Sequence, residues 1–231
     1  MKTFHNQTFD SFDDRDSAAT FHDMVFTKCH FESCELSITR TPTLRSTLHN
    51  MKLLNCSQRD CAISAAVIED VVVDGLNTNG QLFQTWGAVF NRTVLQGKID
   101  RLMISSAVLP GVINHEEQRA FDDANNDYYD HVEWALDISK GEFKEICIRG
   151  LPGCLIRRDP ETQILVTRER ALLGDWKNLN FKENLLPISL EMFLQRADSS
   201  IVLVAPKRHS RFKRYLDDIN LLRLAGVAEP D

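Results

Sequence analysis

Near the N-terminus, large apolar residues recur at every fifth position. The stretch FHDMVFTKCHFESCEL, residues 21–36, places four of them five apart: Phe21, Phe26, Phe31 and Leu36. Met24, Cys29 and Cys34 each lie two residues before the last three of these. A helix that buries one face repeats apolar residues at three and four, and a half-buried strand repeats them at two. A period of five fits neither element, so another geometry must set it.

The same period returns in two later runs. The second run is Leu48, Leu53, Ile63, Ile68 and Val73, with Gln58 at the skipped position. The third run is Val89, Val94, Ile99, Ile104 and Leu109. The segments between the runs, 37–47 and 74–88, contain the Pro, Gly, Asn and Thr that are typical of loops. We therefore expect two insertions that shift the phase of the repeat.

The triplets CHF, CEL and CAI place a small residue two positions before a large apolar one. In this the chain resembles the pentapeptide-repeat family over residues 21–109. The resemblance implies a right-handed, four-sided β-helix in which five residues make one side. Coils stacked about 4.8 Å apart would bury a continuous apolar column. In the third run Arg92 takes a position where the pattern has a small residue.

The sequence predicts a mainly β N-terminal half, a right-handed quadrilateral β-helix of pentapeptide-like coils, followed by a small α+β domain. We assign residues 1–113 to the β-helix, 114–139 to an acidic and aromatic linker, and 140–231 to the α+β domain. In this last part strands are expected at 143–150, 154–159, 163–169 and 199–206. Helices are expected at 171–179, 186–197 and 210–227.

Charge is distributed unevenly along the chain, although the net charge is only -6. Residues 1–139 carry 11 Lys and Arg against 20 Asp and Glu, whereas residues 140–231 carry 16 against 13. No apolar run reaches the roughly 18 to 20 residues that a membrane span needs, and the polar start does not resemble a secretory signal. We expect a cytoplasmic protein that does not bind membranes. In that compartment its six cysteines should be free thiols.

The sequence contains no nucleophile elbow, phosphate-binding loop or dinucleotide-binding fingerprint. We therefore expect no catalytic residues and no cofactor. The two C-x4-C pairs lie near His22, His30 and His49, which invites a zinc interpretation, but their spacing reproduces the repeat. Interior cysteines and no metal are expected instead. Carboxylates at Asp70, Asp74 and Asp100 leave open a carbohydrate-active β-helix enzyme.

Two segments are candidate interaction surfaces. The first, in FDDANNDYYDHVEW, combines acids with aromatic anchors suited to a basic protein: Asp122, Asp123, Asp127, Tyr128, Tyr129, Asp130, Glu133 and Trp134. The alternative for this segment is an acidic linker whose aromatics pack a domain junction. The second, in PKRHSRFKR, gathers five cations: Lys207, Arg208, Arg211, Lys213 and Arg214. These cations could bind phosphate, but a solvated or salt-bridged face is favoured, so we expect no direct binding to nucleic acid.

Rods of this kind with an added domain resemble bacterial immunity proteins. The resemblance implies a non-catalytic protein that neutralises a cognate antibacterial toxin, with a nuclease effector as the expected partner. A rigid acidic rod could cover the basic cleft of such an effector, and its preformed shape would limit the ordering cost. The alternative is a DNA-mimic regulator of DNA gyrase, because some pentapeptide-repeat proteins present a duplex-like acidic rod to topoisomerases.

Overall fold

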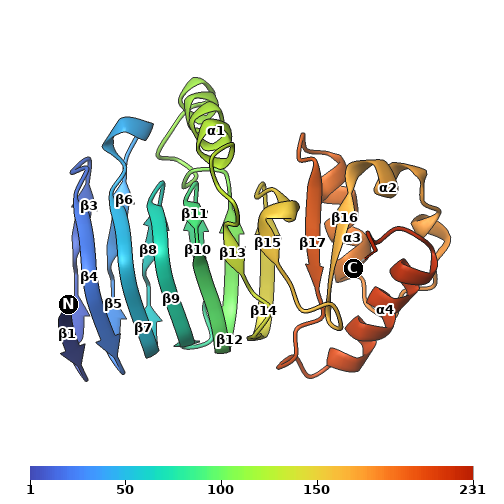
Figure 1. Cartoon of the computed structure of the whole chain (residues 1–231), viewed down its shortest axis with the longest axis horizontal. Helices are drawn as coiled ribbons and strands as arrows, with labels where there is room; N and C mark the ends of the chain where they lie inside the picture. The colour runs from blue at the N-terminus through green and yellow to red at the C-terminus, as the bar shows by residue number, and fades with distance from the viewer. Residues whose placement is uncertain (231) are drawn as a thin grey trace.

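The computed structural model describes residues 1–230. This part of the chain is mainly β, with a large curled sheet of parallel strands and a few helices (Figure 1). The first strands of the curled sheet are β1 (Lys2–His5), β2 (Thr8–Asp10), β3 (Asp13–Arg15), β4 (Thr20–Thr27), β5 (His30–Glu32), β6 (Glu35–Ile38), β7 (Thr47–Arg59) and β8 (Ala62–Ser64). The sheet continues with β9 (Val67–Asn77), β10 (Leu82–Trp86), β11 (Val89–Asn91), β12 (Thr93–Ser105), β13 (Leu136–Asp137), β14 (Gly141–Arg149) and β15 (Ile156–Arg157).

From β1 to β12, residues one layer apart in space are 19 to 27 positions apart in sequence, and the offset is 43 or 44 between β12 and the next strands, β13 and β14. Phe4 pairs with Phe26, and Phe26 pairs with Leu53. The same column continues through Val73 and Leu95. Two further columns are Phe21, Leu48, Ile68 and Phe90, and Leu36, Ile63, Thr85 and Ile104. A fourth contains Phe9, Phe31 and Gln58. Large side chains at fifth positions therefore stack on one another from layer to layer.

The backbone explains the period of five. Two residues after each fifth-position residue of the first two runs, Gln58 included and Leu36 excepted, the chain adopts a left-handed conformation with positive φ. These corner positions are Asp23, Lys28, Ser33, Asn50, Asn55, Asp60, Ala65, Asp70 and Gly75. Asn, Asp and Gly tolerate this conformation better than other residues. A bend at every fifth residue returns the next large side chain to the interior, so the corners set the spacing.

The predicted register of the third run is wrong by one residue at Val89 and Val94, whereas Ile99 and Ile104 line the interior as predicted. Phe90 pairs with Ile68, and Leu95 pairs with Val73. Val89 and Val94, which the sequence analysis placed in those positions, pair with Val67 and Val72 instead. Arg92 consequently does not replace a small interior residue. It lies at a corner with φ 49°, in line with Gly87 and Gly97.

The two predicted insertions differ in size. The segment 37–47 carries the short 3-10 helix η1 (Pro42–Leu44) between β6 and β7. Most of 74–88 is strand, because β9 extends to Asn77 and β10 begins at Leu82. The four residues between these strands form a turn in which the amide of Gln81 donates to the carbonyl of Thr78.

The sheet continues beyond the predicted linker at 114–139. That segment contains helix α1 (His115–Tyr129) and the strand β13. β14 then pairs in parallel with β12, with Gly141 beside Gly97. Residues 141–149, assigned from sequence to the α+β domain, thus extend the curled sheet. α1 stands against one end of its strands (Figure 1).

The C-terminal part has its own core. The antiparallel strands β16 (Gln163–Thr167) and β17 (Ser200–Val204) form a second sheet. Around it lie η2 (Gly153–Leu155), α2 (Arg168–Leu173), η3 (Trp176–Asn178), α3 (Leu185–Leu194) and α4 (Phe212–Leu224) (Figure 1). Trp176, Leu190 and Ile219 are buried in this core. Among residues 1–230, no helix is long and apolar enough to cross a membrane.

Candidate functional site

α1 is fixed at its N-terminus by a capping box. The Asn114 side chain accepts hydrogen bonds from the amides of Glu116 and Glu117, each at 2.9 Å. The Glu117 carboxylate in turn accepts from the Asn114 amide at 2.8 Å and forms an ion pair with Arg40. The hydrogen bonds to the Asn114 amide and to Arg40, opposed by desolvation, hold the pKa of Glu117 below its usual value. Acids at this end are favourable because they face the positive end of the helix dipole.

The second half of α1 and the segment that follows it expose acids that have no such role. We call this set the acidic face: Asp122, Asp123, Asp127, Asp130 and Glu133. No ion pair within residues 1–230 involves any of them, although Asp122 accepts a hydrogen bond from Gln118 at 2.8 Å. The last turn of α1 holds no basic residue, so Asp127 and Asp130 lie at the negative end of the dipole. Their placement there opposes the stability of the helix, which leaves an external partner as a reason for them.

The aromatic residues of this segment face inward. The Tyr128 hydroxyl donates to Glu69 at 2.8 Å, and the Tyr129 hydroxyl accepts from the amide of Phe90 at 3.2 Å. Burial raises the pKa of both hydroxyls. Trp134 lies under the guanidinium of Arg157, 4.1 Å from its ring centroid. The aromatics thus pack against the rest of the protein, and the carboxylates form the exposed part of the predicted surface.

The insertion between β6 and β7 supports α1 from the other side. The guanidinium of Arg45 lies 4.9 Å from the ring centroid of Phe121 and donates to Asn125 at 2.5 Å. Burial lowers the pKa of Arg45 to about 10. Sequence analysis did not identify this contact, because it joins residues 80 positions apart that carry no repeat signal.

The predicted basic patch is largely paired within the protein. Lys207 lies 2.9 Å from Asp159, and Arg208 lies 3.0 Å from Asp100. Arg211 and Arg214 both reach the buried carboxylate of Glu183, at 2.7 and 3.5 Å. Lys213 has no such partner in residues 1–230. These contacts match the salt-bridged alternative for this segment, and they leave little free positive charge.

The three carboxylates considered for sugar chemistry each have a different partner. Asp70 forms a two-point ion pair with Arg92, with both N–O distances 2.7 Å. Asp74 accepts from Gln96 at 2.9 Å, and Asp100 contacts Arg208. The six cysteines are free thiols, of which Cys29 and Cys56 are buried. In the described part of the chain, no group of three or more His, Cys, Asp or Glu is arranged to hold a metal.

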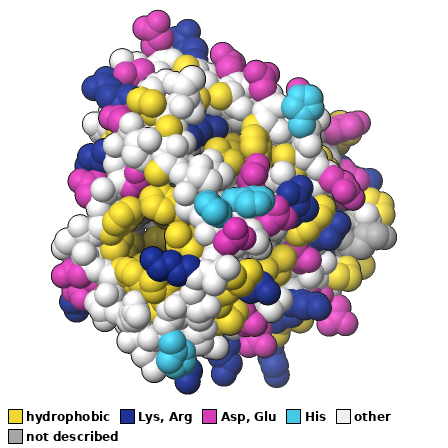
Figure 2. Space-filling model, turned by 60° about the vertical axis from the view of Figure 1, so that its left-hand side comes forward, with side chains coloured by type: hydrophobic (Ala, Val, Ile, Leu, Met, Phe, Trp, Pro, Cys, Tyr) yellow, Lys and Arg dark blue, Asp and Glu magenta, His cyan; other side chains and the backbone are white. Residues whose placement is uncertain are grey.

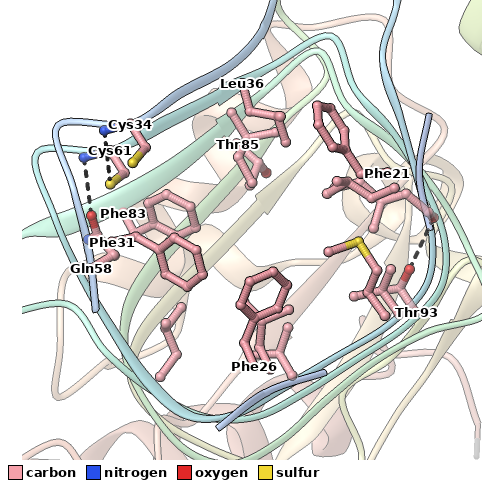
Figure 3. Close-up of a pocket in the computed structure, with 18 of the residues that line it drawn as sticks. Phe21, Phe26, Phe31, Cys34, Leu36, Gln58, Cys61, Phe83, Thr85 and Thr93 are labelled. Atoms are coloured by element: carbon pink, nitrogen blue, oxygen red, sulfur yellow. Dashed lines mark hydrogen bonds between the residues drawn. The ribbon is translucent and has the colours of Figure 1, made fainter. Parts of the chain in front are cut away.

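The concave side of the curled sheet bounds an apolar cavity of about 480 Å³. Its lining comes from the layers between Phe4 in β1 and Ile104 in β12. Figure 3 shows Phe21, Phe26, Phe31, Leu36 and Phe83 directed into one interior from different sides. Figure 2, in which the N-terminal side comes forward, shows a hollow rimmed by hydrophobic side chains. The period of five in the sequence predicted this interior, but not that it is incompletely filled.

An empty space of this size is energetically significant. At about 24 cal/mol for each Å³, leaving it empty would cost on the order of 10 kcal/mol. This cost is comparable to the whole stability of a typical domain, about 5–15 kcal/mol. Water would fill the space poorly, because the lining offers few polar partners.

Comparisons with protein-family models and with curated proteins find no match to this chain.

Proposed function

We propose that the chain is a non-catalytic immunity protein of the bacterial cytoplasm, which binds a cognate antibacterial toxin and blocks it. The observation that carries the proposal is the acidic face of α1. Its five exposed carboxylates have no ion-pair partner within residues 1–230, and two of them oppose the helix dipole. Negative charge in such a position is explained by a positively charged partner. A nuclease domain is the partner class we favour, because its substrate cleft must be basic to bind nucleic acid.

We further propose that the curled sheet closes as a right-handed quadrilateral β-helix of the pentapeptide-repeat type. Three observations support this: the parallel offsets of 19 to 27 residues from β1 to β12, the positive φ at corners five residues apart, and the stacked columns of apolar side chains. Such a scaffold would present α1 rigidly. Little conformational entropy would then be lost on binding, which favours affinity.

In this mechanism α1 covers the toxin's substrate surface. The acidic face steers the encounter and fixes the orientation of the partner, while Tyr128, Tyr129 and Phe121 hold the helix against the sheet. Charge of this kind affects the association rate more than the dissociation rate. The interaction should therefore weaken steeply as salt concentration rises.

The test is co-expression with the effector domain that the neighbouring gene is expected to encode, followed by stopped-flow association. Replacing Asp123, Asp127 and Asp130 with Lys should abolish rescue and slow association at low salt by about tenfold or more. The control replaces Glu142, Glu161 and Glu191 with Lys, which makes the same charge change at exposed acids elsewhere. Equal effects of the two triple variants, or a toxin that neither binds nor is blocked, would reject the proposal.

A further inference from the structure

The cavity in the curled sheet opens toward the N-terminal end of the molecule (Figure 2). Aromatic rings gather in its first two layers. The rings of Phe4 and Phe26 stack with centroids 4.9 Å apart, and those of Phe9 and Phe31 stack at 5.3 Å. Phe12 remains 44% exposed. These rings make an apolar entrance that a small molecule can contact.

None of the residues that line the cavity carries a charge. A charged group carried into this interior would lose its hydration without gaining an ion pair there, which is strongly unfavourable, whereas at the entrance Lys2 lies 5.0 Å from the ring of Phe4. The cavity volume of about 480 Å³ lies within the range of small-molecule sites, about 300–1,000 Å³. The lining extends through all layers from β1 to β12, which favours an elongated occupant over a compact one.

One buried polar group inside the cavity lacks a partner. The hydroxyl of Thr85 is buried, and no hydrogen bond is made by its oxygen. Figure 3 shows this side chain with its oxygen toward the interior. Gln58 is also buried, and its side-chain oxygen accepts a hydrogen bond from the amide of Cys61 at 3.2 Å. By contrast, the hydroxyl of Thr93 donates to the carbonyl of Ile68 at 3.1 Å.

From these observations we propose that the cavity binds a neutral, elongated apolar molecule carrying one hydrogen-bonding oxygen, of the long-chain alcohol class. The apolar body fills the column between the phenylalanine rings and the deeper layers. The oxygen meets the Thr85 hydroxyl, a buried group that otherwise has no partner. This site is separate from the acidic face of α1, so it does not depend on the proposed toxin binding.

The test uses the full chain and the neutral fluorescent probe N-phenyl-1-naphthylamine, which brightens in apolar sites. We expect saturable binding of about one probe per chain, and displacement by 1-octanol and by n-octane. Thr85→Val removes the hydroxyl while keeping the shape of the side chain. Thr85→Val should lower the affinity for 1-octanol about fivefold, because one hydrogen bond is lost. It should not lower the affinity for n-octane, which makes no hydrogen bond. Thr93→Val is the matched control and should leave the relative affinity for the two competitors unchanged.

A second variant tests the location. Val71→Phe fills the cavity from the middle of β9 and should abolish probe binding, whereas Leu173→Ser removes an exposed apolar side chain far from the cavity and should not. Circular dichroism and thermal unfolding identify any variant that fails to fold. The proposal is overturned if probe binding does not saturate, or if Thr85→Val changes the affinities for 1-octanol and n-octane equally. It is also overturned if sedimentation shows a dimer in which a second copy of the chain covers the entrance and excludes the probe.

Discussion

Arg92 combines a strained backbone with a compensating contact. Its φ of 49° lies in the left-handed region, which costs a residue with a Cβ about 1–2 kcal/mol. Its guanidinium pairs with Asp70, the corner residue of the preceding layer, through two contacts of 2.7 Å. Both side chains are partly exposed, so the ion pair itself contributes little.

Substitutions at Arg92 separate these two effects. Arg92→Ala keeps the strained backbone and loses the ion pair, whereas Arg92→Gly loses the ion pair but relieves the strain. We expect the glycine variant to have the higher free energy of unfolding, by about 1 kcal/mol, in urea denaturation. At a position with negative φ, the glycine variant should not have the higher free energy of unfolding. An alanine variant as stable as the glycine variant would contradict the corner geometry.

The pKa of Asp70 reports the same contact. Hydrogen bonding to Arg92, opposed by partial desolvation, holds this pKa below its ordinary value. A depressed carboxyl pKa stabilises the folded state above the unfolded pKa, near 4, and the stabilisation is lost as the pH falls through the folded pKa. In Arg92→Ala, carbon-detected NMR titration should show the Asp70 pKa rising toward its ordinary value. An unchanged pKa would mean that the ion pair does not form in solution.

At the scale of elements, α1 is held by buried tyrosines. Tyr129→Phe leaves the Phe90 amide without its partner at a buried position, which should lower the free energy of unfolding by about 1–3 kcal/mol. Tyr128→Phe should cost less, because Glu69 is partly exposed and can be hydrated. Thermal unfolding of both variants checks this order. The reverse order would indicate that α1 packs differently.

Element predictions from the sequence succeeded where a single pattern was unambiguous. The fifth-position residues of the first two runs line the interior, and the C-terminal helix occupies residues 212–224 within the predicted 210–227. The third run failed at its first two positions because Val89 and Phe90 are both apolar, as are Val94 and Leu95, so side-chain type does not distinguish the two registers there. The corner at Arg92 does distinguish them, but an arginine gives no sequence signal for positive φ.

The candidate sites, too, could be predicted only in part from the sequence. Acids in 122–133 were predicted to be a surface, and the carboxylates are exposed. That Tyr128 and Tyr129 face inward could not be predicted, because their partners Glu69 and Phe90 are distant in sequence. The unfilled cavity could not be predicted from the sequence either. A periodic apolar pattern identifies which side chains enter an interior but not how completely they fill it.

At the scale of the whole molecule, ion pairs join the sheet to the C-terminal part. Arg208, which follows β17, pairs with Asp100 in β12, and its amide donates to the carbonyl of Phe143 in β14. Val202 of β17 is buried in the same core as the curled sheet. The basic residues near 206–214 therefore offset acids of the chain itself. The acidic face of α1, by contrast, has no ion-pair partner within residues 1–230.

Central to this fold is the stacking in columns of side chains from successive layers of the curled sheet. Methyl NMR on selectively labelled protein tests it most directly, through nuclear Overhauser effects among Leu53, Val73 and Leu95. We expect nuclear Overhauser effects from Val73 to both Leu53 and Leu95 across the interior column. Contacts from Val73 to Val94 in place of Leu95, or none between these layers, would contradict the stacking and with it the rigid support for α1.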